Sequence, residues 1–514
     1  MSTAKRVISG SIASWMRIGI TMVSQLVLVP VYLSYWDVTT YGIWIAIQAF
    51  VSVISVLDQG HQAFMEFEFL KDGKENRKNI ALNLWSSVWV GVGIGAIEVL
   101  IVILVISFGA LESLLGESAG VSPVLIKEAS IVLLLQIINW AVLTSIGGIF
   151  VRVLSPFGYY ARMSWWGVWA AVITSFAPVV AVICGADLLY AGITLAIATI
   201  LYSIPQYVDI YKLVNKEALF YQGASLKRGL RNFSLSLVIS AKSLLENARQ
   251  QGVRLILAPL SGAAGLVAFS TMRTGANIVL QGLNTITSPL MPELMRFLNQ
   301  KDQDRMEASF STVWFVVLFL LAPAIIILQL FADPLFTLWT NGRVPFNPYL
   351  FATLSLGVLV FAVAQPAMAV MRGNNLLRPQ FLITLIAASI VVGGMFILVP
   401  RIGIVGAGAS LLLAELAATT GYRIVAKDWL RKNGLSWPQR SSMLALASVW
   451  TAAASMFAMI SFPSLKWIFC IAGVTLIFVL IRFYWASSPM LVKQKVRQIF
   501  GKLPVIKRLI PKYE

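Results

Sequence analysis

The sequence predicts an all-α polytopic membrane protein with about fourteen transmembrane helices, and two observations carry this prediction. Hydrophobic residues make up 58% of the 514-residue chain and charged residues only 12%, with a mean hydropathy of +0.81. Soluble domains carry about 45–50% apolar and about 25% charged residues. The second observation is that most of the 40 Lys and Arg residues lie in short segments between long apolar runs. A water-soluble globular enzyme is therefore excluded.

The apolar runs, read with a window of about 19 residues, define the expected spans. In the first half they are Ile8–Leu33, Tyr41–Leu57, Ile80–Phe108, Glu128–Phe150, Met163–Cys184 and Leu188–Val208. In the second half they are Phe233–Leu257, Ala264–Pro289, Thr312–Phe331, Tyr349–Met371, Gln380–Val399, Ile402–Tyr422, Ser441–Ile460 and Leu465–Tyr484.

The basic residues orient these spans. With both termini cytoplasmic, 31 Lys and Arg residues fall on inward segments, four on outward segments and five within spans. The positive-inside rule favours this arrangement, which also explains the net charge of +18 without a nucleic-acid partner. The basic tail after Trp485 is expected either to rest on anionic membrane lipids or to be a solvated tail that fixes orientation.

Few residues are available for catalysis or metal binding. Cys184 and Cys470 lie in apolar runs and His61 is the single histidine, so neither a disulfide framework nor a metal site is expected. The longest outward loops, 109–127 and 332–348, are too short for a folded domain of about 50 residues. The inward linkers hold no P-loop or G-x-G-x-x-G pattern. The sequence thus predicts no enzyme, no cofactor and no nucleotide.

The two halves of the chain resemble each other weakly. Gly42 and Gly265 each open a span after a proline and a short polar turn, at a separation of 223 residues. Arg162 and Arg378 start corresponding spans 216 residues apart. This spacing predicts two parallel six-helix lobes. The expected division is 1–222 for the first six spans, 223–430 for the next six, and 431–514 for two extra C-terminal helices and a basic cytoplasmic tail.

Several short motifs resemble a known family. They are Val29-Pro30, Tyr41-Gly42-Ile43-Trp44, Leu57-Asp58-Gln59-Gly60, the glycines Gly262 and Gly265, and Pro289 with Pro292-Glu293. In this pattern, over about residues 5–430, the chain resembles the bacterial polysaccharide-transport proteins. These are the O-antigen and exopolysaccharide repeat-unit flippases of the multidrug/oligosaccharidyl-lipid/polysaccharide exporter superfamily.

The resemblance implies a function. Such a protein moves an undecaprenyl-diphosphate-linked oligosaccharide across the bacterial inner membrane, by alternating access of two lobes around a central cavity. It implies an H⁺ or Na⁺ gradient as the driving force, a role in lipopolysaccharide or exopolysaccharide biosynthesis, and glycan polymerase and chain-length proteins as partners. Two alternatives stay open: a cation-coupled multidrug antiporter of the same superfamily, and a non-transporting scaffold of a glycan-assembly complex.

Cationic side chains within the spans are the candidate substrate-binding residues, because a charge at mid-bilayer costs about 2.5–3.5 kcal/mol. They are Arg17, Lys242, Arg249, Arg254 and Arg273. At 100° per residue, Lys242, Glu246 and Arg249 share one helical face, and Arg17 lies at a similar depth. We expect Arg17, Lys242 and Arg249 to bind the diphosphate, with Glu246 between the two basic residues of the seventh span. The alternative is that these residues form structural ion pairs or snorkel to an interface.

The intramembrane acids Glu98, Glu246 and Glu415 are the candidate coupling groups, since a buried carboxyl group can carry a proton. Glu98 and Glu415 have the alternative role of hydrogen bonding between packed helices. Asp58 is expected to cap or bracket the end of the second span. His61 is expected to lie at the membrane interface on an amphipathic stretch.

The tryptophans near span ends predict an aromatic belt. Trp140 is counted among these belt residues. Trp165, Trp166 and Trp169 have the alternative role of stacking on sugars.

Overall fold

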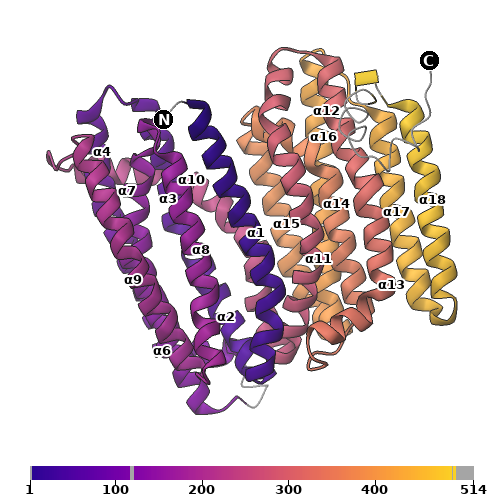
Figure 1. Ribbon diagram of the computed structural model, residues 1–514, viewed down its shortest axis with the longest axis horizontal. Coiled ribbons are helices and arrows are strands. Elements are labelled where there is room, and N and C mark those ends of the chain that lie inside the picture. The colour runs from indigo at the N-terminus through magenta and orange to yellow at the C-terminus, as the bar shows by residue number, and fades with distance from the viewer. Residues whose placement is uncertain (1–2, 116–120, 489, 492, 494–514) are drawn as a thin grey trace. The chain divides into compact units, whose positions relative to one another are not determined.

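A computed structural model describes residues 3–115, 121–488, 490–491 and 493, which form helices and the turns between them. Parts of some expectations lie outside the described residues. These are the side chains of Lys5 and Arg6 and of the Pro289–Glu293 motif, the middle of the loop 109–127, and the basic tail from residue 494. Figure 1 shows the order of the helices along the chain.

Contacts divide the chain into two compact units. The first comprises Met1–Thr271, Thr337–Pro345 and Met395–Ile404, and the second comprises Met272–Phe336, Phe346–Gly394 and Val405–Glu514. The segment from Leu226 to Thr271 therefore packs with the N-terminal part of the chain. The lobes predicted from the repeat, 1–222, 223–430 and 431–514, stay a prediction.

The first unit contains the helices up to α10 and the beginning of α11. They are α1 (Thr3–Tyr35), α2 (Val38–Ile54), α3 (Val56–Asp72), α4 (Arg77–Ser107), α5 (Ala110–Leu115), α6 (Pro123–Asn139), α7 (Ile146–Val153), α8 (Tyr160–Ile183), α9 (Leu188–Lys216), α10 (Leu226–Asn247) and α11 (Val253–Asn299). Helix α8 packs between α1 and α9, whereas α10 packs on α3 and α4. A core of Met65, Phe69, Ile80, Leu84 and Ile149 joins α3, α4 and α7.

The second unit contains the rest of α11 and the helices that follow. They are α12 (Gln303–Val316), α13 (Ala322–Trp339), α14 (Pro348–Gly373), α15 (Leu377–Ile402), α16 (Ile404–Lys432), α17 (Gln439–Ser461) and α18 (Lys466–Ser487). Helix α17 packs on α14 and α18. The core includes Phe310, Trp314 and Tyr484, and Tyr484 donates its hydroxyl proton to the carbonyl of Ser311 at 2.7 Å.

The membrane-spanning helices follow the predicted runs closely. Among the described residues, twelve helical runs are long and apolar enough to cross a membrane, or thirteen if α2 and α3, bent by 42°, form one span. The run Leu226–Ile278 has 53 residues, and a straight helix of that length measures about 80 Å against a hydrocarbon core of about 30 Å. Gly262 breaks this run with φ 67° and ψ 177°, a conformation open to glycine. The run thus accommodates the two spans predicted on either side of Gly262.

Side-chain caps set the start of several helices. Asp37, Asp187 and Asn347 each accept a hydrogen bond from the backbone N–H three residues later, at 2.8, 2.8 and 3.0 Å. Such a cap satisfies one of the four N–H groups that a helix start leaves without a partner. These polar turns explain why the chain reverses direction at these points.

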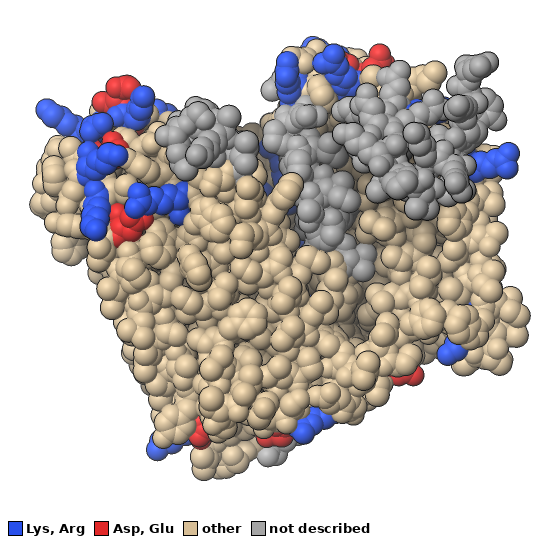
Figure 2. Space-filling view, in the orientation of Figure 1, with Lys and Arg blue, Asp and Glu red and all other residues tan. Residues whose placement is uncertain are grey.

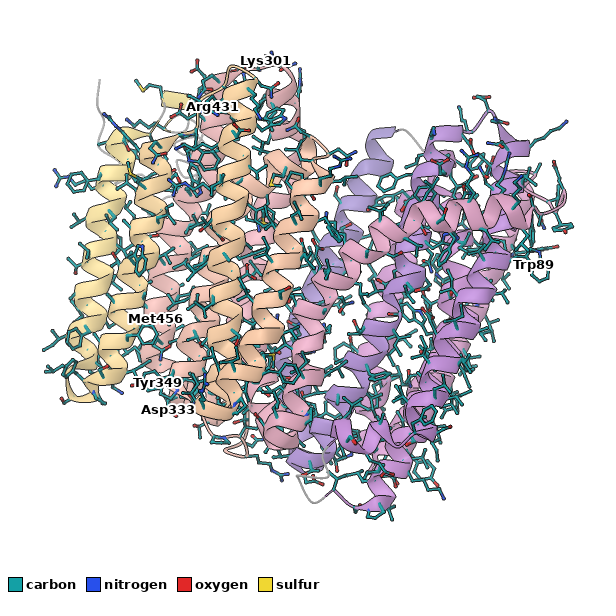
Figure 3. All side chains as sticks on the ribbon, turned by 180° about the vertical axis from the view of Figure 1, so that it is seen from behind. Trp89, Lys301, Asp333, Tyr349, Arg431 and Met456 are labelled. Carbon is teal, nitrogen blue, oxygen red and sulfur yellow. The ribbon has the colours of Figure 1, made fainter. Side chains whose placement is uncertain are left out.

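Charged side chains gather at the ends of the helices and leave apolar flanks, as Figure 2 shows. At one end of the first unit, Arg77 on α4 lies 3.3 Å from Glu217 after α9, and Arg152 on α7 lies 2.6 Å from Glu66 on α3. In the second unit, Lys301 and Arg431 share one end, whereas Asp333 and Tyr349 lie at the other (Figure 3). The predicted orientation, with the Lys216 and Asn341 loops on opposite faces of the membrane, stays a prediction.

At the end of the first unit away from Arg77 and Arg152, the last residue of α13 and the turn after it form hydrogen bonds with α1 and Trp36. Pro30 in α1 has no N–H, so the carbonyl of Leu26 lacks its helical donor. Trp339 supplies one, because its Nε1 donates to that carbonyl at 2.6 Å. Asn341 donates to Ser34 Oγ at 2.9 Å, and Arg343 Nη1 donates to the carbonyl of Trp36 at 3.1 Å.

We predict that Lys216 and Asn341 face opposite sides of the membrane, with Lys216 in the cytoplasm. Single cysteines placed at each position in a chain free of Cys184 and Cys470 should react differently with an impermeant maleimide. Asn341→Cys should label in intact cells, and Lys216→Cys only after permeabilisation. The cysteine-free chain is the control, and reversed labelling would overturn the orientation.

Candidate functional site

Two carboxyl groups are buried together in the first unit. Asp58 on α3 is 1% exposed and Glu98 on α4 is 0% exposed, and they are close enough for their charges to interact. Oδ2 of Asp58 accepts hydrogen bonds from Gln62 Nε2 at 3.0 Å and from Trp140 Nε1 at 3.2 Å. Oδ1 of Asp58 and both carboxylate oxygens of Glu98 have no hydrogen-bond partner among the described residues.

The carboxylate oxygens without a hydrogen-bond partner among the described residues indicate that burial of this pair is costly. A buried polar atom without a partner costs about 1–3 kcal/mol, and more if it is charged. Two adjacent carboxylates also repel each other, so a bound positive charge stabilises the pair. Among the described residues, no group of three His, Cys, Asp or Glu side chains is placed to hold a metal ion. A proton or a cation bound between the two carboxyl groups would satisfy these oxygens and remove the repulsion.

A wide helical turn forms one wall of this site. The segment η2 (Trp140–Ser145) is a π-helical turn between α6 and α7, and such turns loosen the backbone hydrogen-bond ladder. Gln62 Nε2 donates to the carbonyl of Thr144 at 3.0 Å, and the Tyr207 hydroxyl donates to the carbonyl of Leu143. A Cβ atom at Gly147 or Gly148 would collide with Tyr207 or Gln62. The two glycines thus let these side chains reach the turn.

His61 is buried within the first unit, whereas the sequence predicted an exposed position on an amphipathic stretch at the membrane interface. The side chain is 1% exposed because α10 covers this face of α3. Its Nδ1 lies 3.4 Å from Ser236 Oγ, and its ring contacts Phe233 edge to face. Farther along α3, Met65 and Phe69 are buried, whereas Phe67 is exposed.

The predicted cationic face lies on α10 and the turn that follows it. Lys242 and Glu246 are half-buried on α10, one helical turn apart. Arg249, also half-buried, lies in η4 (Ala248–Gly252), another π-helical turn. The wider turn changes the rotation per residue, so the 100° spacing used to place Arg249 on the same face does not hold there. Asn247 anchors the end of α10 by donating to the carbonyl of Ser52 on α2 at 2.9 Å.

Two further predicted arginines belong to the first unit. Arg17 on α1 is exposed and passes beside Gly167 of α8, where a Cβ would lie 3.8 Å from its Nη1. Arg254 on α11 donates to Gln251 Oε1 at 2.8 Å, and its buried Nε has no partner among the described residues. Arg17 thus presents its charge at a surface, whereas Arg254 is largely engaged inside the helix bundle.

The remaining candidates belong to the second unit. Arg273 on α11 is 8% exposed. Glu415 on α16 is half-buried, and a Cβ at Gly357 of α14 would touch its side chain at 4.0 Å. Both side chains make polar or electrostatic interactions within the structure. Their assignment to substrate binding and to coupling stays a prediction.

The buried pairing of Asp58 with Glu98 was not predicted from the sequence. Asp58 is not a helix cap, because α3 continues past it and turns its side chain towards α4 and η2. Trp140, assigned to the aromatic belt, instead donates a hydrogen bond in the interior. One signal was present: Asp58 and Gln62 are four residues apart, a spacing that places them on one helical face.

Structural comparison places the fold among known transporters. The structure of the lipid II flippase MurJ in an inward closed conformation matches with a TM-score of 0.65, at 13% identity, over 93% of this chain and 99% of that chain. An inward-facing multidrug resistance MATE family transporter of the MOP superfamily matches with a TM-score of 0.58, at 12% identity, over 80% and 94%. A MOP superfamily transporter from Pyrococcus furiosus Vc1 matches with a TM-score of 0.51, at 15% identity, over 82% and 95%.

These matches define the class of fold. The protein is a multi-pass membrane protein with the fold seen in these transporter structures, so the predicted all-α membrane fold is confirmed. Its membership of the superfamily stays a prediction. No family model matches the sequence, and no curated protein matches it either. The polysaccharide-transport branch stays a prediction.

We predict that Trp140→Phe lowers the stability of the folded protein by about 1.5–3 kcal/mol, because a buried carboxylate loses a hydrogen-bond donor. Thermal unfolding of the purified chain in detergent measures the change. Trp89→Phe is the matched control, since Trp89 on α4 is 59% exposed (Figure 3). Equal melting temperatures for the two variants would contradict the role given to Trp140.

Proposed function

We propose that the chain is a flippase that moves an undecaprenyl-diphosphate-linked oligosaccharide across the bacterial inner membrane, by alternating access coupled to an H⁺ or Na⁺ gradient. The observation that carries this proposal is the fold shared with a lipid II flippase over 93% of this chain and 99% of that chain. The MATE structure leaves a larger part of this chain unmatched, since it covers 80%.

The charges within the membrane support an anionic cargo. Lys242 and Arg249 on the α10–η4 segment and Arg17 on α1 are cations in apolar helices of the first unit. A diphosphate in a membrane is costly to desolvate, so several cations should surround it. Arginine donates two parallel hydrogen bonds to phosphate, whereas lysine acts as a point charge. Glu246, one turn from Lys242, balances part of this charge when no substrate is bound.

A cation-coupled multidrug antiporter is the second candidate, and the MATE structures support it by their shared fold. Cationic drugs require acidic pockets, and the Asp58–Glu98 pair is a small acidic site of this kind. We assign that pair to coupling instead, because it is fully buried and small. A non-transporting scaffold is the weakest alternative, since it gives buried charges no role.

Helix α10, which carries Lys242 and Glu246, contacts residues next to Asp58 on α3. The carbonyl of Leu57, the residue before Asp58, accepts a hydrogen bond from Ser240 Oγ on α10 at 3.4 Å. His61, three residues after Asp58, contacts Ser236 on the same helix. A change in the occupant of the Asp58–Glu98 pair therefore acts on α10, which carries Lys242 and Glu246.

Transport by purified protein in liposomes tests the proposal. The probe is a fluorescent undecaprenyl-diphosphate-linked disaccharide whose arrival in the outer leaflet is read by a membrane-impermeant quencher. We expect translocation by the wild type, and a reduction of at least about tenfold in Arg249→Ala, which corresponds to about 1.4 kcal/mol. Arg249→Lys should recover part of the rate, because the charge is kept and the bidentate geometry is lost. Arg17→Ala should also slow translocation.

Arg401→Ala is the matched control, since Arg401 is an exposed arginine at the end of α15. It should translocate the probe at the wild-type rate. Unchanged rates in both Arg17→Ala and Arg249→Ala would show that the diphosphate binds elsewhere. Efflux of a cationic dye without translocation of the lipid-linked probe would favour the antiporter.

We predict that Glu98→Gln uncouples transport from the ion gradient. The amide keeps the shape of the side chain but cannot exchange a proton or balance a cation with its charge. Translocation driven by an imposed H⁺ or Na⁺ gradient should fall to the rate seen without a gradient. Glu112→Gln, an exposed carboxylate on α5, should retain full gradient dependence. Retained dependence in Glu98→Gln would assign coupling to other residues.

A further inference from the structure

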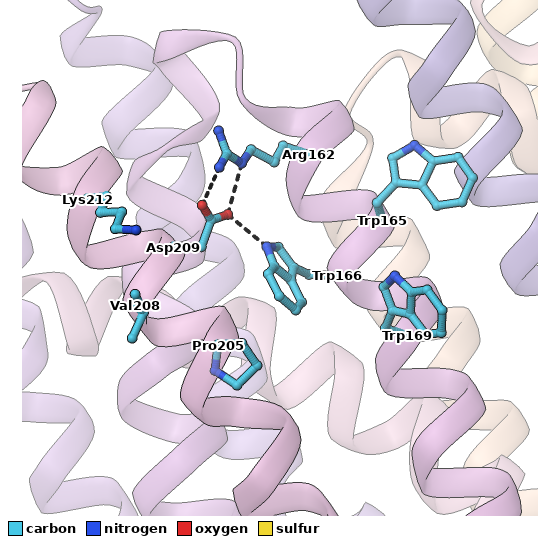
Figure 4. A pocket seen from close by; sticks show the side chains of 8 residues that line it. All are labelled: Arg162, Trp165, Trp166, Trp169, Pro205, Val208, Asp209 and Lys212. Carbon is cyan, nitrogen blue, oxygen red and sulfur yellow. Dashed lines mark hydrogen bonds and ion pairs between the residues drawn. The ribbon is translucent and has the colours of Figure 1, made fainter.

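A pocket of about 350 Å³ opens between the first turns of α8 and the last turns of α9, within the first unit (Figure 4). The transport proposal does not use it. Its principal lining side chains are Arg162, Trp165, Trp166 and Trp169 from α8, and Asp209 and Lys212 from α9.

An ion pair between Arg162 and Asp209 forms the polar end of the pocket. Arg162 binds both carboxylate oxygens of Asp209, with Nε 2.9 Å from Oδ2. Trp166 Nε1 donates to the same Oδ2 at 2.8 Å, and the carbonyl of Trp166 accepts from the Tyr202 hydroxyl at 2.8 Å. Asp209 is 11% exposed in its side chain. Its carboxylate therefore accepts three hydrogen bonds and fixes the guanidinium in place.

This end of the pocket keeps a positive character. Asp209 engages two of the five N–H donors of Arg162, and 54% of the Arg162 side chain remains exposed. Lys212, one helical turn beyond Asp209, is exposed and lines the same pocket. The three side chains together carry a charge of +1. An anion can thus bind to donors that the ion pair has already oriented.

The pocket lies where the charged end of the unit meets its apolar flank. On the charged side, the hydroxyl of Tyr159 donates to Glu217 Oε1 at 2.7 Å. On the other side, the exposed surface of α9 is apolar, with Ile204 and Val208 among its residues. Trp169 lies about 10 Å deeper along α8 than Arg162, at 1.5 Å per residue. Tryptophan with one apolar and one polar edge favours this depth in a membrane.

We propose that this pocket binds the headgroup of an anionic phospholipid from the surrounding bilayer. The phosphodiester accepts hydrogen bonds from Arg162 and Lys212, and the acyl chains follow Val208 and Ile204 along α9. Zwitterionic lipids fit less well, because their ammonium group meets a positive site whose single carboxylate is already engaged. The tryptophans then pack on the glycerol and upper acyl region instead of on sugars.

The phosphate chemistry alone does not separate a bilayer lipid from the lipid-linked cargo of the proposed flippase. The position of the pocket favours the bilayer lipid, since its apolar side is the exposed flank of α9. A lipid held there would bridge α8 and α9 at their charged ends.

Binding of tail-labelled phosphatidylglycerol to the purified full chain in neutral detergent, followed by fluorescence anisotropy, tests the site. Unlabelled phosphatidylglycerol should displace the probe at least about tenfold more effectively than phosphatidylcholine with the same chains. Lys212→Gln should weaken binding at least about fivefold. Lys78→Gln, a matched exposed lysine in the first turn of α4, should change binding by less than about twofold.

Arg162→Lys provides a second variant that keeps a cation beside Asp209, and it should also weaken binding because the oriented donors are lost. Equal affinity in the wild type, Lys212→Gln and Arg162→Lys would overturn the proposal. Displacement by undecaprenyl diphosphate at lower concentrations than phosphatidylglycerol would also overturn it, because the pocket would then belong to the cargo pathway. Neither outcome depends on whether the flippase assay succeeds.

Discussion

Hydrocarbon offers no hydrogen-bond partners, so every backbone N–H and C=O within the membrane must be satisfied by the protein itself. Regular helices meet this requirement along most of the chain. The departures from regular geometry are the places where side chains complete the backbone. Gln62 and Tyr207 donate to carbonyls of the π-helical turn η2. The candidate coupling site lies beside this departure, since Trp140 at the start of η2 also binds Asp58.

The spans and their polar ends were predictable because hydropathy and the distribution of Lys and Arg report directly on the bilayer. The arrangement of side chains inside the candidate site was harder to predict from the sequence. Asp58 ends the predicted span Tyr41–Leu57, which suggested a cap. The chain instead bends by 42° and continues as α3. Periodicity placed Arg249 by α-helical geometry, whereas η4 has wider turns. His61 has polar neighbours in sequence, but its burial depends on α10, about 175 residues later.

The acidic and basic side chains in the first unit differ in how deeply they are buried. Asp58 and Glu98 are buried where α3, α4 and η2 meet, and three of their four carboxylate oxygens have no hydrogen-bond partner among the described residues. Lys242 and Arg249 are half-buried and Arg17 is exposed. The unit thus combines an enclosed acidic site with more open basic positions, and α10 contacts the helix that carries Asp58.

The contact at Pro30 has a consequence for how this protein diverges in evolution. Trp339 and Arg343 donate to the main-chain carbonyls of Leu26 and Trp36, not to their side chains. Every residue type offers such a carbonyl, so α1 can change most of its side chains without losing the contact. The contact then depends on the proline that frees the carbonyl and on the donor that reaches it. Contacts of this kind tolerate extensive change in the side chains of the helix that supplies the carbonyl.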